Sequence, residues 1–224
     1  KYFKEVMSTE PLSRKLGKAD FRLLQEIYSQ NEESRHIAQM ADKLHPWAAL
    51  VFAGSTFPKG YSSETGADML LTNAAVGINK PRGSLESLDD VTAIFKAQPE
   101  ETMLNFLKAS IKTNKEETED IKKLHQAYSD GHFEELIPLL EETEQRTLKL
   151  VDTKYAKAMS DWLKNDLLIR RNLAWLPEIR KQSAKQSTLF AVGIAHLPSE
   201  KGLIELLRQE GYQVTPKPKV LIWQ

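Results

Sequence analysis

The chain has no cysteine among its 224 residues. Disulfide frameworks, thiolate nucleophiles and cysteine-ligated metal sites are therefore excluded, and a metal ion has to be held by histidine, carboxylate or carbonyl groups. The sequence also has no apolar run near the roughly 20 residues that a membrane-spanning helix requires. We therefore expect no membrane span.

Net charge is absent as well, because 31 lysines and arginines balance 31 aspartates and glutamates. No large electrostatic field is available to attract nucleic acid or an anionic membrane surface. The length suits one domain with a sizeable core. We expect a single domain over residues 1–224 that does not bind nucleic acid.

Helical periodicity dominates the sequence. Apolar residues recur at helical spacing over residues 19–29 and 34–44, and the stripe over residues 67–78 predicts a helix that packs closely against a neighbour. Residues 99–150 are helical in pattern and heavily charged. We expect this stretch to form a helical insertion or lobe of solvated helices.

Short β-prone or extended segments occur towards the C-terminus. Thr188–Val192 is apolar and bounded by polar residues, Tyr212–Thr215 is predicted to be extended, and Val220–Trp223 is predicted to be an edge strand. Together with the helices, these segments favour an α-rich α/β fold.

A histidine follows the first of these segments directly. Residues 193–197 have the pattern of a strand-to-helix turn, which places His196 where α/β proteins tend to build sites, close to the free N–H groups of a helix. A glycine three residues before a histidine is common by chance. His196 is therefore either a site residue or a histidine that satisfies backbone partners at a turn.

Polar side chains also interrupt an apolar helical stripe. Arg171 and Asn172 fall within the stripe over residues 167–179, where a permanently charged guanidinium needs a carboxylate, phosphate or carbonyl partner and an amide needs several hydrogen bonds. The alternative for Arg171 is a charged end that reaches water at the edge of the stripe.

Two carboxylates are further candidates. Asp68 could point into a cleft, or it could be a first-turn acid favoured by the helix dipole, and Glu86 is either a site group or an exposed carboxylate at the end of an extended segment. No G-x-S-x-G, Walker A, dinucleotide-binding or H-E-x-x-H motif is present, so familiar hydrolase and nucleotide-binding signatures are absent.

Several blocks together resemble the TraB/GumN family, which is related to the Tiki metalloproteases and more distantly to erythromycin-esterase-like proteins. The resemblance spans roughly residues 44–216, and its C-terminal block is the most specific. The blocks are Val192–Val214, Arg171–Ile179, His45–Trp47, Gly66–Asp68 and Lys80–Glu86.

The resemblance implies a small central sheet surrounded by helices and a site built from two G-x-x-H motifs with carboxylates. His196 would be the histidine of the second motif, either a ligand of a divalent metal ion or an acid/base group, with Gly193 beside it. Arg171 would stabilise developing negative charge or a site carboxylate, and Asn172 would fix its geometry. Asp68 and Glu86 would contribute to binding.

The first G-x-x-H motif is missing. Nothing before Leu44 matches it, so we expect the domain to be N-terminally incomplete and the partner histidine to lie outside this sequence. The function expected first is a metal-dependent hydrolase of peptide or ester bonds, in which a metal-bound water is the nucleophile.

Two alternatives remain. One is a non-catalytic peptide-binding or regulatory protein, as the family's association with conjugation-pheromone control suggests. The other is a purely structural role for Arg171 and His196. The resemblance further implies a bacterial protein and leaves its compartment open, including an extracytoplasmic one after signal removal; the substrate would be a peptide or a small molecule.

Overall fold

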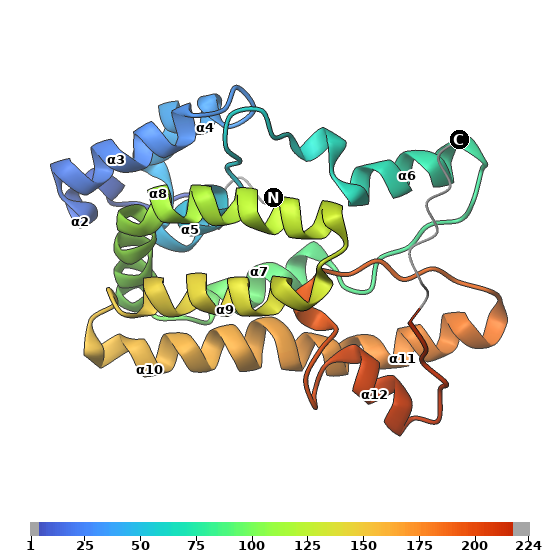
Figure 1. Ribbon diagram of the computed structural model, residues 1–224. Coiled ribbons are helices and arrows are strands. Elements are labelled where there is room, and N and C mark those ends of the chain that lie inside the picture. Colours follow the sequence, from blue (N-terminus) through green and yellow to red (C-terminus); the bar gives the residue numbers. More distant parts are fainter. Residues whose placement is uncertain (1–4, 217–224) are drawn as a thin grey trace.

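The computed structural model describes residues 5–216, and helices make up most of that range (Figure 1). The α-helices are α2 (Leu12–Leu16), α3 (Lys18–Ser29), α4 (Arg35–Met40), α5 (Pro46–Gly54), α6 (Ala67–Gly77), α7 (Leu88–Lys96), α8 (Glu100–Asp130), α9 (Phe133–Leu148), α10 (Thr153–Asp161), α11 (Arg170–Lys185) and α12 (Leu203–Gln209). The remaining helical turns are η1 (Ala41–Lys43), η2 (Ser63–Thr65), the π-helix η3 (Trp162–Ile169) and η4 (Ile194–His196).

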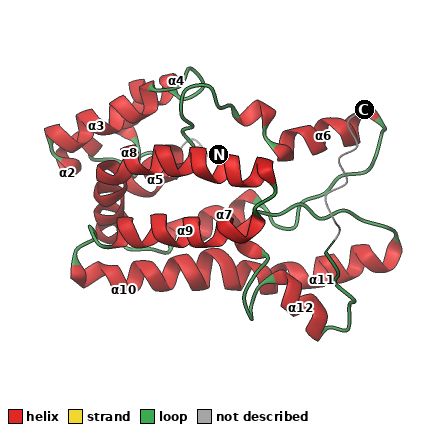
Figure 2. Ribbon diagram, in the orientation of Figure 1, coloured by secondary structure: helices red, strands yellow, loops and turns green. Residues whose placement is uncertain are grey.

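The predicted central sheet is wrong. Residues 5–216 contain no strand, as Figure 2 shows, and their β-structure is limited to one isolated antiparallel bridge between Met7 and Leu44. Residues 187–193 and 212–216 have no regular secondary structure, because no neighbouring segment pairs with them. The edge strand expected at Val220–Trp223 lies outside the described residues. An all-helical fold replaces the expected α/β fold.

The long helix α8 organises the larger of two cores. Its first half buries Met103, Leu107 and Ile111, and the helices α2, α3, α5 and α10 pack around them. At its end, Gly131 adopts a left-handed conformation with φ 83°, which lets α9 return along α8 (Figure 1). Residues 99–150 therefore form a helical hairpin whose first arm contributes to the main core.

A second, smaller core lies at the other end of the molecule. Trp175, Leu176 and Ile179 of α11 pack against Leu203 and Leu206 of α12. The two cores are joined by a continuous run of helical residues from Thr153 to Lys185, in which α10 passes through η3 into α11 (Figure 1). The candidate site lies where this run meets η4.

The helix α6 stands apart from both cores (Figure 1). It has no buried residue, and Leu70 and Ile78 are 59% and 71% exposed. The expected close packing of its apolar stripe is therefore wrong. None of the described helices combines the length and apolar character needed to cross a bilayer.

Candidate functional site

The site begins on α11, directly after a π-helical segment. π-helical turns are rare and frequently occur at functional sites, because they change the direction in which the following side chains project. Arg171 and Asn172 are the second and third residues beyond η3; the side chain of Arg171 reaches Glu86, and that of Asn172 reaches His196. Asn172 is only 2% exposed. A buried amide at this position needs specific partners.

Arg171 finds a carboxylate partner in Glu86. Its Nη2 and Nε atoms donate to the two oxygens of Glu86 at 2.5 and 3.0 Å, and its Nη1 donates to the carbonyl oxygen of Leu167 at 2.9 Å. This two-point geometry is the strongest that an arginine and a carboxylate form. Glu86 is held in place because Ser87, the next residue, caps α7 through reciprocal hydrogen bonds with Asp90.

His196 is the buried centre of the site. It lies in η4, is 7% exposed, and its Nδ1 is 2.7 Å from Oδ1 of Asn172. The amide nitrogen of Asn172 donates to the carbonyl oxygens of Lys201 and His196, at 2.9 and 3.3 Å. Oδ1 of Asn172 is therefore the acceptor, so Nδ1 of His196 carries the hydrogen and Nε2 keeps its lone pair.

The unprotonated nitrogen of His196 faces the guanidinium group. In this tautomer Nε2 accepts a long hydrogen bond from Nη1 of Arg171, at 3.4 Å. Burial, and after it the positive charge of Arg171, lower the pKa of His196, Glu86 partly opposes both effects, and the net result is a pKa of about 4. The imidazole is consequently neutral at physiological pH, with its lone pair beside a positive charge.

Trp175 covers this arrangement. Its ring centroid is 4.5 Å from that of His196, and Cζ of Arg171 lies 5.0 Å from its ring. Its Nε1 is buried and has no hydrogen-bond partner among the described residues. The sequence pattern places Trp175 only in the apolar stripe over residues 167–179. The signal for its role was its spacing of four residues from Arg171, which places both on one face.

Of the other predicted site residues, Gly193 lies beside the cluster formed by Glu86, Arg171, Asn172 and His196, and Asp68 does not. Gly193 is exposed next to His196, and a Cβ atom built on it would lie 3.7 Å from the ring atom Cδ2. Asp68 is exposed in the first turn of α6 and shares no hydrogen bond or ion pair with the described residues of the cluster. The structure thus brings together Glu86, Arg171, Asn172, Gly193 and His196.

A family model for the TraB/PrgY/gumN family matches residues 3–216. The chain belongs to the TraB/PrgY/gumN family. Comparisons with curated proteins and with solved structures gave no match. The family assignment made from the sequence blocks is therefore confirmed.

The cluster of this TraB/PrgY/gumN chain offers few donor groups for a metal ion. Nε2 of His196 is unprotonated, but it accepts from Arg171, and Glu86, the carboxylate of the cluster, is already paired with Arg171. Catalytic zinc sites use three protein ligands, and a guanidinium 3.4 Å from Nε2 repels a cation. The residues of this cluster by themselves do not fit a metal ion.

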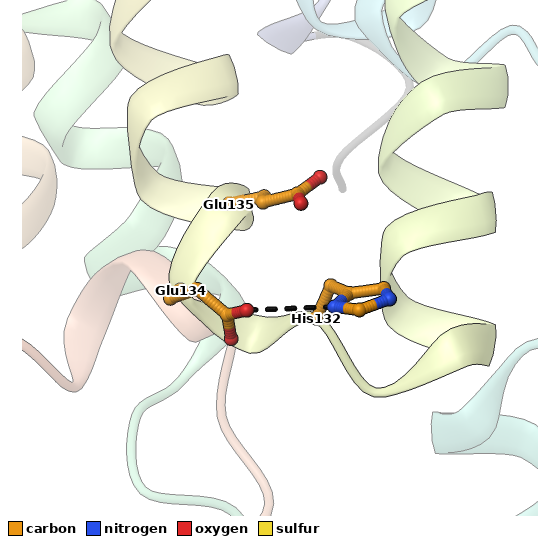
Figure 3. A group of neighbouring side chains, drawn as sticks. All are labelled: His132, Glu134 and Glu135. Carbon is orange, nitrogen blue, oxygen red and sulfur yellow. Dashed lines mark ion pairs between the residues drawn. The ribbon is translucent and has the colours of Figure 1, made fainter.

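A different group of possible metal ligands lies at the start of α9. His132, Glu134 and Glu135 offer ligand atoms within 4.8 Å of one another (Figure 3), and His132 and Glu134 form an ion pair at 3.4 Å. All three residues are exposed, and the positive end of α9 favours carboxylates here without any cation. None of the three residues shares a printed hydrogen bond or ion pair with Glu86, Arg171, Asn172 or His196, and local electrostatics explain the group.

A cavity flanks the cluster without being lined by its side chains. It has a volume of about 560 Å³ and lies between the loop after His196 and α12. Its walls are formed by residues 197–201 together with Ile204, Glu205, Arg208 and Gln209. The cluster side chains do not line it, so a ligand bound there would contact the loop that carries Lys201.

Proposed function

We propose that this TraB/PrgY/gumN protein is a hydrolase of peptide or ester bonds in which Nε2 of His196 is the proton acceptor. The observation that carries the proposal is the hydrogen bond between Asn172 Oδ1 and His196 Nδ1, at 2.7 Å. It fixes the tautomer in which Nε2 is free, as an orienting residue does for a catalytic histidine.

The pKa of His196, about 4, makes the imidazole a weaker base than an unperturbed histidine and a stronger acid once it is protonated. At neutral pH the imidazole is unprotonated and accepts a proton from a water molecule, whose oxygen attacks the carbonyl carbon of the substrate. The imidazolium then formed is a strong acid and returns the proton to the leaving nitrogen or oxygen as the scissile bond breaks. The basicity of His196 is comparable to that of a carboxylate general base.

Arg171 supplies the positive charge for the developing oxyanion. Its Nη1 lies beside Nε2 of His196, while Nε and Nη2 remain bound to Glu86. Glu86 is therefore a positioning residue that fixes the direction of the guanidinium. A donor held in place before the reaction stabilises negative charge without reorganisation.

A metal-dependent form of the same hydrolysis is the second candidate. Histidines that bind metal ions generally donate their other ring N–H to an oxygen acceptor, and the contact between Nδ1 of His196 and Asn172 has this form. A divalent metal ion on Nε2 would need further ligands besides those of the cluster, and Nη1 of Arg171 would have to move away.

Non-catalytic peptide binding is the third candidate, because Glu86 already neutralises the cation that an oxyanion would use. In this case the site binds a peptide but does not cleave it.

The test is hydrolysis of a panel of chromogenic peptides and esters by the wild type and by His196→Gln and Arg171→Ala. We expect each variant to lose at least about a hundredfold in kcat/KM. Matched controls are the exposed His36→Gln and Arg170→Ala, which should retain the wild-type rate. A rate that rises through about pH 4 and stays level to neutral pH is expected for His196 as the base.

The three candidates give different results. Hydrolysis that persists in EDTA supports the base mechanism, and hydrolysis that is lost in EDTA and restored by Zn²⁺ or Mn²⁺ supports the metal-dependent one. Absence of turnover across the panel, with or without these ions, contradicts hydrolysis and leaves peptide binding.

A further inference from the structure

Trp175 lies against both functional groups of the site. Cζ of Arg171 lies over its ring, 5.0 Å from the centroid, and the imidazole centroid of His196 lies 4.5 Å away. Trp175 follows Arg171 by four residues on α11, so the two side chains share one face of that helix. The indole is only 4% exposed. Its contact with the guanidinium group is therefore largely removed from water, which strengthens a cation–π interaction.

The hydrogen bonds of Arg171 do not fix its guanidinium group completely. Nε and Nη2 donate to Glu86, and Nη1 donates to the carbonyl oxygen of Leu167 at 2.9 Å. A guanidinium group bound to a carboxylate along one edge can still pivot about that edge. Packing against an aromatic ring restricts this movement, and arginine stacks readily on such rings.

The position of Arg171 matters most when His196 is protonated. In the neutral site Nε2 accepts from Nη1 at 3.4 Å. When Nε2 takes up a proton this hydrogen bond is lost, and the two positive groups repel each other. The repulsion pushes Nη1 away from the place where the oxyanion forms. The negative face of the Trp175 ring attracts cations, so it opposes this displacement at the step where charge develops.

The N–H group of the indole does not account for this contact. Nε1 of Trp175 is buried and has no hydrogen-bond partner among residues 5–216. The N–H group lies in the plane of the ring, whereas Arg171 lies over the ring, so it does not point at the guanidinium group. The contact with Arg171 therefore belongs to the face of the ring, which phenylalanine also offers and leucine lacks.

We infer that Trp175 is a positioning residue of the proposed hydrolase, whose ring holds the guanidinium group of Arg171 beside Nε2 of His196 during proton transfer. The inference rests on the proposed function and adds an aromatic contact to those that fix the oxyanion donor. Trp175 acts through Arg171 and not through the substrate. Removal of its ring should therefore lower kcat and leave KM nearly unchanged.

Hydrolysis of the chromogenic panel by Trp175→Leu and Trp175→Phe tests this role. Leucine is apolar but has no aromatic face, so we expect kcat to fall by about tenfold or more, with KM within about twofold. Phenylalanine keeps an aromatic face without the N–H group and should stay within about threefold of the wild-type kcat. Trp175→Met is a second replacement without a ring and should behave as Trp175→Leu does.

Trp47→Leu is the matched control. Trp47 is buried in the larger core, where its ring contacts those of His45 and Phe95. Its replacement should lower the free energy of unfolding in urea but leave kcat unchanged. Urea unfolding also establishes that each Trp175 variant is folded.

Two further measurements separate positioning from packing. In an Arg171→Ala background, Trp175→Leu should change kcat/KM by less than about threefold, because the group that it positions is absent. NMR reports the position of Arg171 without turnover, since an aromatic ring shields nuclei above its face. The Nε–H signal of Arg171 should move downfield in Trp175→Leu and stay near its wild-type position in Trp175→Phe and Trp47→Leu.

Three results would overturn the inference. They are a wild-type kcat and an unmoved Arg171 signal in Trp175→Leu, equal losses of kcat in Trp175→Phe and Trp175→Leu, and a full further loss from Trp175→Leu in the Arg171→Ala background. Failure of the proposed function is distinguishable. If the panel is not cleaved at all, hydrolysis is contradicted, whereas a downfield move of the Arg171 signal in Trp175→Leu still supports the positioning of Arg171 by Trp175.

Discussion

One amide group decides which nitrogen of His196 is free. Asn172 donates through Nδ2 to two carbonyl oxygens and accepts through Oδ1 from His196, so its orientation is determined by three separate contacts. The sequence predicts that Arg171 needs a counter-charge, and the structure provides Glu86. Which of the 31 acidic residues pairs with Arg171 depends on tertiary packing, so the spacing of residues in the sequence could not identify Glu86 as the partner.

The first prediction concerns this amide. Asn172→Asp places a carboxylate opposite Nδ1 of His196, which favours the imidazolium and raises the pKa of His196 well above its present value of about 4. NMR titration of the histidine ring signals measures the change. Asn73→Asp on the exposed helix α6 is the control and should leave the titration of His196 unchanged. An unaltered pKa in Asn172→Asp would contradict the assigned contact.

The second prediction follows from the same pKa. The pKa of His196 is about 4 in the folded chain and about 6.5 when unfolded, so the unfolded state takes up the proton first as pH falls. The stability contributed by the neutral imidazole is complete above about pH 6.5 and is lost towards pH 4, by about 3 kcal/mol.

Urea unfolding of the wild type and of His196→Gln between pH 7 and pH 4 measures this contribution. The other acidic and histidine side chains titrate in both proteins, so the difference between the two curves reports His196. We expect the free energy of unfolding of the wild type to fall more steeply with decreasing pH. Parallel curves would show that His196 is not buried as a neutral group.

At the level of the elements, helices were more predictable than strands. A helix completes its hydrogen bonds within its own residues, so the pattern over residues 19–29 is enough to predict α3 (Lys18–Ser29). A strand needs a partner, and Thr188–Val192 has the composition of a strand but no described neighbour to pair with. The packing of α6 was also predicted wrongly, because periodicity shows an apolar face but not what covers it.

The third prediction tests the loop that holds the site. A Cβ atom at Gly202 would lie 1.9 Å from the carbonyl oxygen of Pro198 and 2.4 Å from that of Leu197, so Gly202→Ala has to shift this backbone. The shift moves the carbonyl of Lys201, which accepts from Asn172. We expect a loss of stability of about 1–3 kcal/mol in thermal or urea unfolding, together with a perturbed His196 ring signal.

Gly77→Ala is the matched control for this change. Gly77 ends α6, and its Cβ position has no heavy atom within 4 Å. Alanine there should be neutral or slightly stabilising, because it reduces the freedom of the unfolded chain. Equal stability of the two variants would mean that the loop after His196 accommodates the added methyl group.

At the level of the whole molecule, stability is unevenly distributed. The core around α8 buries Met103 and Leu107 completely, and the second core depends on the contact between α11 and α12. The site is linked to both, because Arg171 and Asn172 continue the helical run from the first core while His196 belongs to the loop of the second. Arg171 and Asn172 lie on α11, the helix that also forms the second core, so the distance between Nη1 of Arg171 and Nε2 of His196 depends on how α11 packs against the loop that carries His196.

The fourth prediction is that hydrogen exchange shows a large difference in stability between helices. An isolated helix of α6's length, 11 residues, is marginal in water, and α6 has no buried residue to stabilise it. Its amide hydrogens should therefore exchange orders of magnitude faster than those of the first half of α8, whose opening requires the larger core to unfold. Exchange followed by mass spectrometry or NMR measures both helices in one experiment. Protection of α6 equal to that of α8 would show that a partner surface covers its apolar side chains in solution, and Leu70→Asp would then remove that protection while leaving α8 unaffected.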